Sequence, residues 1–83
     1  MTVLGQVQKP GSFPLSTGMT LLQAISFAGG FNAIAKRNNV VLTRRTKSGT
    51  VTVTVDVEAI TDGDKKDIAL QAGDQIYVNE RIF

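Results

Sequence analysis

Residues 20–30 read TLLQAISFAGG, and this stretch decides the fold. Thr20 followed by Gln23 has the spacing of a capping box, so a helix is predicted to begin at Leu21. Its apolar residues fall on one arc: Leu21, Leu22, Ala24, Ile25 and Ala28. Gly29 and Gly30 can adopt the left-handed backbone that ends a helix. A helix of about eight residues is not stable alone in water, so this one must pack on a sheet.

The residues before the helix have the pattern of two strands. Thr2–Val7 alternates between apolar and polar positions, which predicts a strand. Pro10 and Gly11 are typical of a turn. Ser12–Leu15 is then predicted to return as a short strand, and Pro14 should place it at an edge or a bulge because proline cannot donate to a ladder.

The residues after the helix predict a longer hairpin, formed by strands Asn39–Thr46 and Thr50–Val57. We take Ser48-Gly49 as its two-residue loop. The more apolar face then carries four pairs: Val40 with Val57, Leu42 with Val55, Arg44 with Val53, and Thr46 with Val51. Arg44 lies toward the end of this face, where its stem can pack while its head reaches water.

The C-terminal third predicts short elements. Glu58–Ile60 is a candidate helical turn, Ile68–Leu70 a short strand, Gln71–Asp74 a turn, and Gln75–Val78 the last strand. The order of elements predicts an α+β fold in which a mixed sheet of about five strands wraps around one short helix. That is the outline of a β-grasp fold.

Length and composition exclude several classes of protein. The 83 residues suffice for one domain, residues 1–83. Cysteine and histidine are absent, which excludes disulfides, zinc sites built on those residues, and Ser–His or Cys–His catalysis. Residues 62–67 resemble a calcium loop only faintly, because Lys66 occupies a ligand position. Gly29 and Gly30 follow a helix, whereas a phosphate-binding glycine loop precedes one. We therefore predict no catalytic residue, metal or cofactor.

No targeting or membrane segment is visible in the sequence. The longest nearly apolar stretch, Leu21–Phe31, is too short to span a bilayer. Met1 and Thr2 run straight into a strand pattern, without the basic and apolar regions of a signal peptide. We expect either a cytoplasmic protein or a domain excised from a longer one.

Charge is distributed unevenly along the chain. Residues 1–47 carry six basic and no acidic residues, whereas residues 48–83 have a net charge of −4. The basic residues that could meet acidic sugars, phosphates or an acidic neighbour are Lys36, Arg37, Arg44, Arg45 and Lys47. The alternative is ordinary solvated charge. The two halves could meet across subunits, or within the fold, with Arg45 or Lys47 near the loop at residues 62–67. Nucleic-acid binding is not expected, because the aromatic residues do not interleave with the basic residues along the chain.

Phe27 is the remaining candidate contact residue. It falls on the polar side of the predicted helix, beside Gln23. With Phe13 or Phe31 it could form an exposed apolar patch for a partner. Alternatively, it covers an edge of the core beneath a loop.

Five motifs in order resemble the soluble-ligand-binding β-grasp (SLBB) domain of bacterial outer-membrane polysaccharide-export proteins. They are Val3-x-Gly5-x-Val7-x-x-Pro10-Gly11, Thr20-Leu21-Leu22-x-Ala24-Ile25-x-x-Ala28-Gly29-Gly30, Val40-x-Leu42-x-Arg44, Val55-Asp56-Val57, and Leu70-x-x-Gly73-Asp74-x-Ile76-x-Val78. The matching residues are mainly those that determine the fold: Gly5, Pro10, Gly11, Thr20, Gly29, Gly30, Gly73 and Asp74. Phe27 and Asn79 depart from the family pattern.

The resemblance implies a non-enzymatic module of a capsular or exopolysaccharide export protein. It implies a location on the periplasmic face of the outer membrane, within a larger secreted or lipid-anchored parent. The implied partners are neighbouring copies of the parent, other export machinery and the polysaccharide, without nucleic acid or direct membrane insertion. The alternative is a stand-alone β-grasp module that binds a small ligand such as a sugar or a cofactor.

Overall fold

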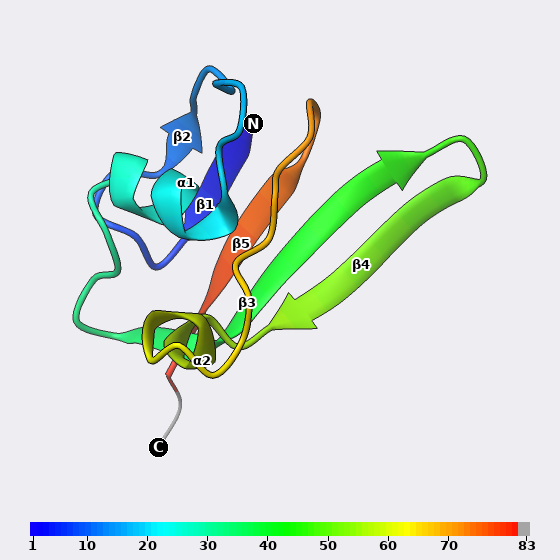
Figure 1. Ribbon diagram of the computed structural model, residues 1–83. Coiled ribbons are helices and arrows are strands. Elements are labelled where there is room, and N and C mark those ends of the chain that lie inside the picture. Colours follow the sequence, from blue (N-terminus) through cyan, green and yellow to red (C-terminus); the bar gives the residue numbers. More distant parts are fainter. Residues whose placement is uncertain (82–83) are drawn as a thin grey trace.

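The computed structural model describes residues 1–81, which form a mixed five-stranded sheet with two short helices (Figure 1). The elements in chain order are β1 (Thr2–Gly5), β2 (Gly11–Ser12), α1 (Leu21–Phe27), β3 (Ala35–Thr46), β4 (Gly49–Val55), α2 (Val57–Thr61) and β5 (Gln75–Glu80). The sheet order is β2-β1-β5-β3-β4. The last strand, β5, lies at the centre, parallel to β1 and antiparallel to β3. The predicted α+β class is confirmed.

The predicted caps define both ends of α1. The Thr20 hydroxyl accepts a hydrogen bond from the Gln23 amide at 3.3 Å, and the Gln23 side chain accepts one from the Thr20 amide at 3.0 Å. At the other end, the Gly30 amide donates to the Ile25 carbonyl at 2.9 Å, and Gly29 and Gly30 both have positive φ angles. The helix therefore begins and ends where local chemistry satisfies its free backbone groups.

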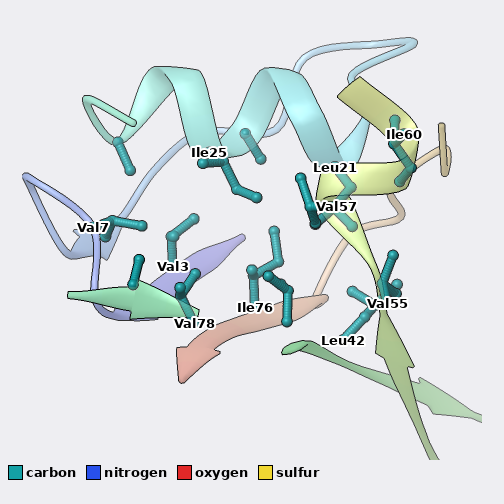
Figure 2. Close-up of a cluster of buried hydrophobic side chains, with 14 of the residues drawn as sticks. Val3, Val7, Leu21, Ile25, Leu42, Val55, Val57, Ile60, Ile76 and Val78 are labelled. Carbon is teal, nitrogen blue, oxygen red and sulfur yellow. The ribbon is translucent and has the colours of Figure 1, made fainter. Parts of the chain in front are cut away.

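The hydrophobic core lies between the two helices and one face of the sheet (Figure 2). From α1, Leu21 and Ile25 are at most 2% exposed, and Val57 of α2 is fully buried beside them. The sheet contributes Val3, Val40, Ile76 and Val78, all fully buried. Full burial of such side chains contributes about 1.5–3 kcal/mol each, which explains how a seven-residue helix is held. Within residues 1–81, no helix is long and apolar enough to cross a bilayer.

The predicted register of the long hairpin is wrong by two residues. The turn consists of Lys47 and Ser48, not Ser48 and Gly49, and Thr46 pairs with Gly49. The observed pairs on the core face are Val40 with Val55, Leu42 with Val53, and Arg44 with Val51. A shift by two residues keeps every side chain on its predicted face, because side chains alternate with a period of two. Gly49, with a φ of 132°, is the residue that follows this turn.

Two short strands are smaller than predicted. The return strand β2 contains Gly11 and Ser12 only, and it ends before Pro14, which has no N–H for a ladder. Residues 68–70 form no named strand: Ala69 makes an isolated bridge with Thr20. The bridge joins this segment to the residue before α1, and the chain then enters the turn before β5.

A close backbone contact determines the residue at position 5. Gly5 has a φ of 85°, and a Cβ there would overlap the carbonyl oxygen of Val78 on the neighbouring strand. A backbone atom in a central strand cannot move aside as a flexible side chain can. Glycine is therefore required at the end of β1 for both its φ angle and its size.

An ion pair links β3 to the turn before β5. Both carboxylate oxygens of Asp74 accept hydrogen bonds from Arg44, from Nε at 3.1 Å and from Nη2 at 2.8 Å. The same carboxylate accepts the Gln71 amide at 2.8 Å, and Arg44 Nη2 also donates to the Ala69 carbonyl at 2.9 Å. The Asp74 side chain has no exposed surface, whereas 26% of the Arg44 side chain is exposed. Arg44 thus connects β3 to the turn before β5, and its guanidinium is bound within the fold, not simply extended into water.

The pair also determines the protonation of Asp74. Burial of the carboxyl group acts to raise its pKa, but the hydrogen bonds from Arg44 and Gln71 and the charge of Arg44 outweigh burial and lower the pKa below its ordinary value. The pKa of Arg44 is raised, mainly by its hydrogen bonds to Asp74. Asp74 is therefore a buried carboxylate whose charge is fully compensated.

We predict that Gly5→Ala lowers the free energy of unfolding by about 2–5 kcal/mol, from backbone strain and overlap with Val78. Gly30→Ala is the matched control, because Gly30 has nearly the same φ, 84°, with nothing within 4 Å of the new Cβ. Gly30→Ala should lower the free energy of unfolding by only about 1–2 kcal/mol, the cost of placing alanine at a positive φ. Urea unfolding measures both losses, and equal losses would contradict the close contact at Gly5.

We predict that Arg44→Gln lowers the free energy of unfolding by about 2–3 kcal/mol at pH 7, because it leaves the Asp74 carboxylate buried and unpaired. This loss is smaller than the usual cost of breaking a buried ion pair, because Arg44 is partly exposed to water. The folded pKa of Asp74 is lowered, so the contribution of the pair is complete above the ordinary carboxyl pKa of about 4 and is lost below it. The difference between wild type and variant should therefore narrow as pH falls through about 4.

Arg45→Gln is the control for this experiment, because Arg45 is exposed and forms no ion pair with an acidic side chain of residues 1–81. Urea unfolding between pH 7 and pH 3 should show little change for it. A difference between wild type and Arg44→Gln that stays constant across this pH range would contradict the role of the Asp74 charge.

Candidate functional site

The six predicted contact residues lie in four separate places. Lys36 and Arg37 lie together near the start of β3, and Arg44 is bound to Asp74. Arg45 and Lys47 lie on the β3–β4 hairpin, and Phe27 lies at the end of α1. The basic residues therefore do not form one patch, because the long strand β3 separates them.

Lys36 and Arg37 are positioned by an irregularity in β3. Ala35 pairs with Glu80 and Val40 pairs with Val78, so four residues of β3 lie opposite one residue of β5. Extra residues in one strand form a bulge, which bends the strand and redirects its side chains. Residues 36–39, here called the β3 bulge, consequently project from the sheet. The predicted strand Asn39–Thr46 begins four residues too late, because β3 begins at Ala35.

Two adjoining hollows open beside the β3 bulge. The larger, of about 510 Å³, is lined by Lys36, Arg37 and Asn38 of the bulge and by Asn32, Glu58 and Arg81 among others. The smaller, of about 340 Å³, lies between α1 and α2 and includes Phe31. Arg37 and Glu58 line both, so we treat the hollows together as the Arg37 cleft.

Arg37 is held over an aromatic ring in this cleft. Its guanidinium carbon lies 5.7 Å from the centre of the Phe31 ring, a distance at which a cation is attracted to the ring face. Arg37 is exposed and forms no ion pair with an acidic side chain of the described residues. The ring thus restrains the guanidinium while its N–H donors remain available to a ligand.

Two asparagine side chains hold the backbone around the cleft in place, and neither is predicted to do so by the sequence. Asn79 of β5 donates from Nδ2 to the backbone carbonyl and the side-chain oxygen of Asn39, at 3.2 and 3.0 Å, and so fastens the end of the bulge. Asn32 donates to the Gln6 side chain at 2.8 Å and accepts the Ile34 amide at 3.0 Å. The contact from Asn32 to the amide two residues later is typical of turns that begin with asparagine. The contact with Gln6 joins residues far apart along the chain, so residue spacing does not predict it.

Phe27, the last residue of α1, contacts Phe13. The ring centres are 5.3 Å apart and the ring planes meet at 71°, which is an edge-to-face contact. Phe13 packs against the core, whereas Phe27 remains 56% exposed. Phe27 therefore covers part of Phe13 and leaves much of its own side chain exposed to solvent.

The basic and acidic parts of the chain meet within the fold in the ion pair between Arg44 and Asp74, which contribute one residue each. Arg45 and Lys47, which could have met the acidic loop after α2, form no ion pair with residues 1–81. In that loop, Asp67 accepts hydrogen bonds from the Leu22 and Ile68 amides, at 3.3 and 2.8 Å. The carboxylate thus supports the positive end of α1.

The Arg37 cleft has the chemistry of a binding site for a polar anionic ligand. Lys36 and Arg37 supply positive charge, and Asn32 and Asn38 supply amide groups that can bond hydroxyls. A volume of about 510 Å³ matches small-ligand pockets in proteins. Glu58 is the acidic residue shared by both hollows.

Comparison with known proteins assigns the family. No curated protein matches the chain. A family model described as the SLBB domain matches residues 1–55. Those 55 of the 83 residues include β1, β2, α1, β3 and β4, and thus the β3 bulge and most of the sheet. The chain belongs to the SLBB domain family.

Proposed function

We propose that this domain is a non-catalytic binding module of a capsular or exopolysaccharide export protein, and that its Arg37 cleft contacts an acidic polysaccharide. The observation that carries the proposal is the cleft itself, in which Lys36 and Arg37 have no acidic partner among residues 1–81 and lie beside amide groups. Membership of the SLBB family, a family of binding domains, supports binding over catalysis.

Acidic sugars fit the cleft better than neutral sugars do. A uronate carboxylate can accept two parallel hydrogen bonds from a guanidinium, and such charge-assisted bonds are about twice as strong as neutral ones. Because Phe31 already restrains Arg37, less side-chain entropy is lost when a ligand binds. Amide groups of Asn32 and Asn38 complement sugar hydroxyls.

The proposal places the domain in a longer parent protein at the periplasmic face of the outer membrane. Its protein partners would be neighbouring copies of the parent and other export machinery. The exposed side of Phe27 and the unpaired charges of Arg45 and Lys47 lie away from the Arg37 cleft. They therefore leave surface for protein contacts while the cleft binds glycan.

A stand-alone small-ligand-binding module is the second candidate. The volume of the larger hollow favours it, because about 510 Å³ could enclose a single sugar. The two candidates differ in the ligand length that they require. A polymer contact should strengthen with chain length, whereas a small-ligand site should bind a monosaccharide as well as an oligomer.

We predict that oligogalacturonate binds and shifts the amide NMR signals of residues 36–38 and 58, whereas neutral galacto-oligosaccharides of the same length do not. Arg37→Gln should weaken binding by about tenfold, the effect of losing a hydrogen bond to a charged group. Arg45→Gln removes the same charge outside the cleft and should bind as wild type does.

Three outcomes separate the alternatives. Equal binding of acidic and neutral oligomers would contradict recognition of acidic sugars. Galacturonic acid that binds as tightly as the oligomer would favour the small-ligand module. Absence of shifts with any of these sugars would contradict glycan binding at the cleft and leave protein contact as the role of the domain.

A further inference from the structure

One edge of the sheet is free of any partner in residues 1–81. β4 is the terminal strand of the sheet order, and the β3–β4 hairpin extends away from both helices (Figure 1). The turn closes with Thr46 paired to Gly49, so the alternation of an antiparallel pair directs the N–H and C=O groups of Thr50, Thr52 and Thr54 away from β3. Residues 49–54 are all exposed.

This edge lacks the features that normally prevent strand pairing. Proline, charged residues, bulges and short length protect most edge strands. The opposite edge follows that rule, because β2 has two residues and is followed by Pro14. β4 has seven residues without charge, proline or bulge, and Val51 and Val53 are 47% and 46% exposed. The sheet is thus protected at one edge and open at the other.

We propose that β4 pairs antiparallel with β4 of a second copy of this chain, about a two-fold axis, and so joins the two five-stranded sheets. The pairing specifies one of the contacts between neighbouring copies that the proposed function includes, and only its biological role rests on that function. The pairing itself depends on the edge, the sequence of the strand and the charges at its ends.

The sequence of β4 is self-complementary in this arrangement. Threonine and valine alternate from Thr50 to Val55. With Thr52 opposite Thr52 of the second copy, Thr50 lies opposite Thr54, so the free edge groups of both copies meet. Val51 then lies opposite Val53 of the second copy on the other face. One arrangement therefore satisfies the backbone groups and covers the exposed valines.

Charges at the two ends of β4 favour the antiparallel direction. Lys47 lies in the turn before the strand, and Asp56 and Glu58 follow the strand. Antiparallel pairing brings Lys47 of each copy toward Asp56 of the other, the residue that directly follows β4, whereas parallel pairing would bring Lys47 against Lys47. Lys47 has no ion-pair partner within residues 1–81, so its charge is available for this contact.

Sedimentation equilibrium over a concentration series, up to about 1 mM because the interface is small, tests the pairing. We expect a monomer–dimer equilibrium. Thr52→Pro removes an edge N–H but no bond to β3, so it should raise the dissociation constant at least about tenfold through two lost hydrogen bonds. Thr52→Val keeps the N–H and should stay within about threefold of wild type. Circular dichroism confirms that each variant is folded.

A charge reversal provides a test that does not depend on proline. Lys47→Glu should weaken the dimer, because it places a negative charge against Asp56 of the second copy, whereas Lys9→Glu, in the turn before β2, should have no effect. A wild-type monomer throughout the series, a folded Thr52→Pro variant that still dimerises, or a Lys47→Glu variant that dimerises as tightly as wild type would overturn the proposal. Glycan binding is measured separately, so failure of the dimer leaves the proposed cleft function standing, and the reverse also holds.

Discussion

The bidentate contact between Arg44 and Asp74 is the constraint on which the closing of the sheet depends. β5 is the central strand, yet it is the last strand along the chain, and the turn before it must place Ile76 and Val78 in the core in the correct register. Asp74 holds that turn through the Gln71 amide and joins it to β3 through Arg44. Without this cation the buried carboxylate would cost about 2–3 kcal/mol, so the arginine on the apolar face of β3 stabilises the fold.

The β3 bulge shows how a small fold obtains a binding site without a separate domain. A regular β3 would direct residues 36–39 alternately to the two faces of the sheet. The bulge instead groups Lys36, Arg37 and Asn38 at one rim, where Asn79 fastens the backbone and Phe31 restrains Arg37. The cleft is thus built from backbone irregularity next to a rigid core, as is common for functional sites.

The two edges of the sheet have opposite character. Gly5 brings β1 close to β5, and β2 closes that side with two residues. On the other side, β3 and β4 run past the core, so the apolar alternation of β4 continues beyond Val55 into solvent at Val53 and Val51. The residues that would be core in a larger sheet are therefore surface in a single copy, which is the physical basis for assembly through β4.

The sequence alone determined the ends of α1, the faces of the strands and the α+β class, because caps, glycine positions and periodicity act over a few residues. It also identified Lys36 and Arg37 as candidate contacts, and it placed Arg44 on the apolar face. Only the tertiary structure decided the hairpin register, the bulge and the partner of Arg44. A register shift of two residues leaves the periodicity unchanged, and Asp74 lies 30 residues from Arg44 along the chain. Local patterns carry no information about such distances, because they are fixed by how the packed core brings the strands together.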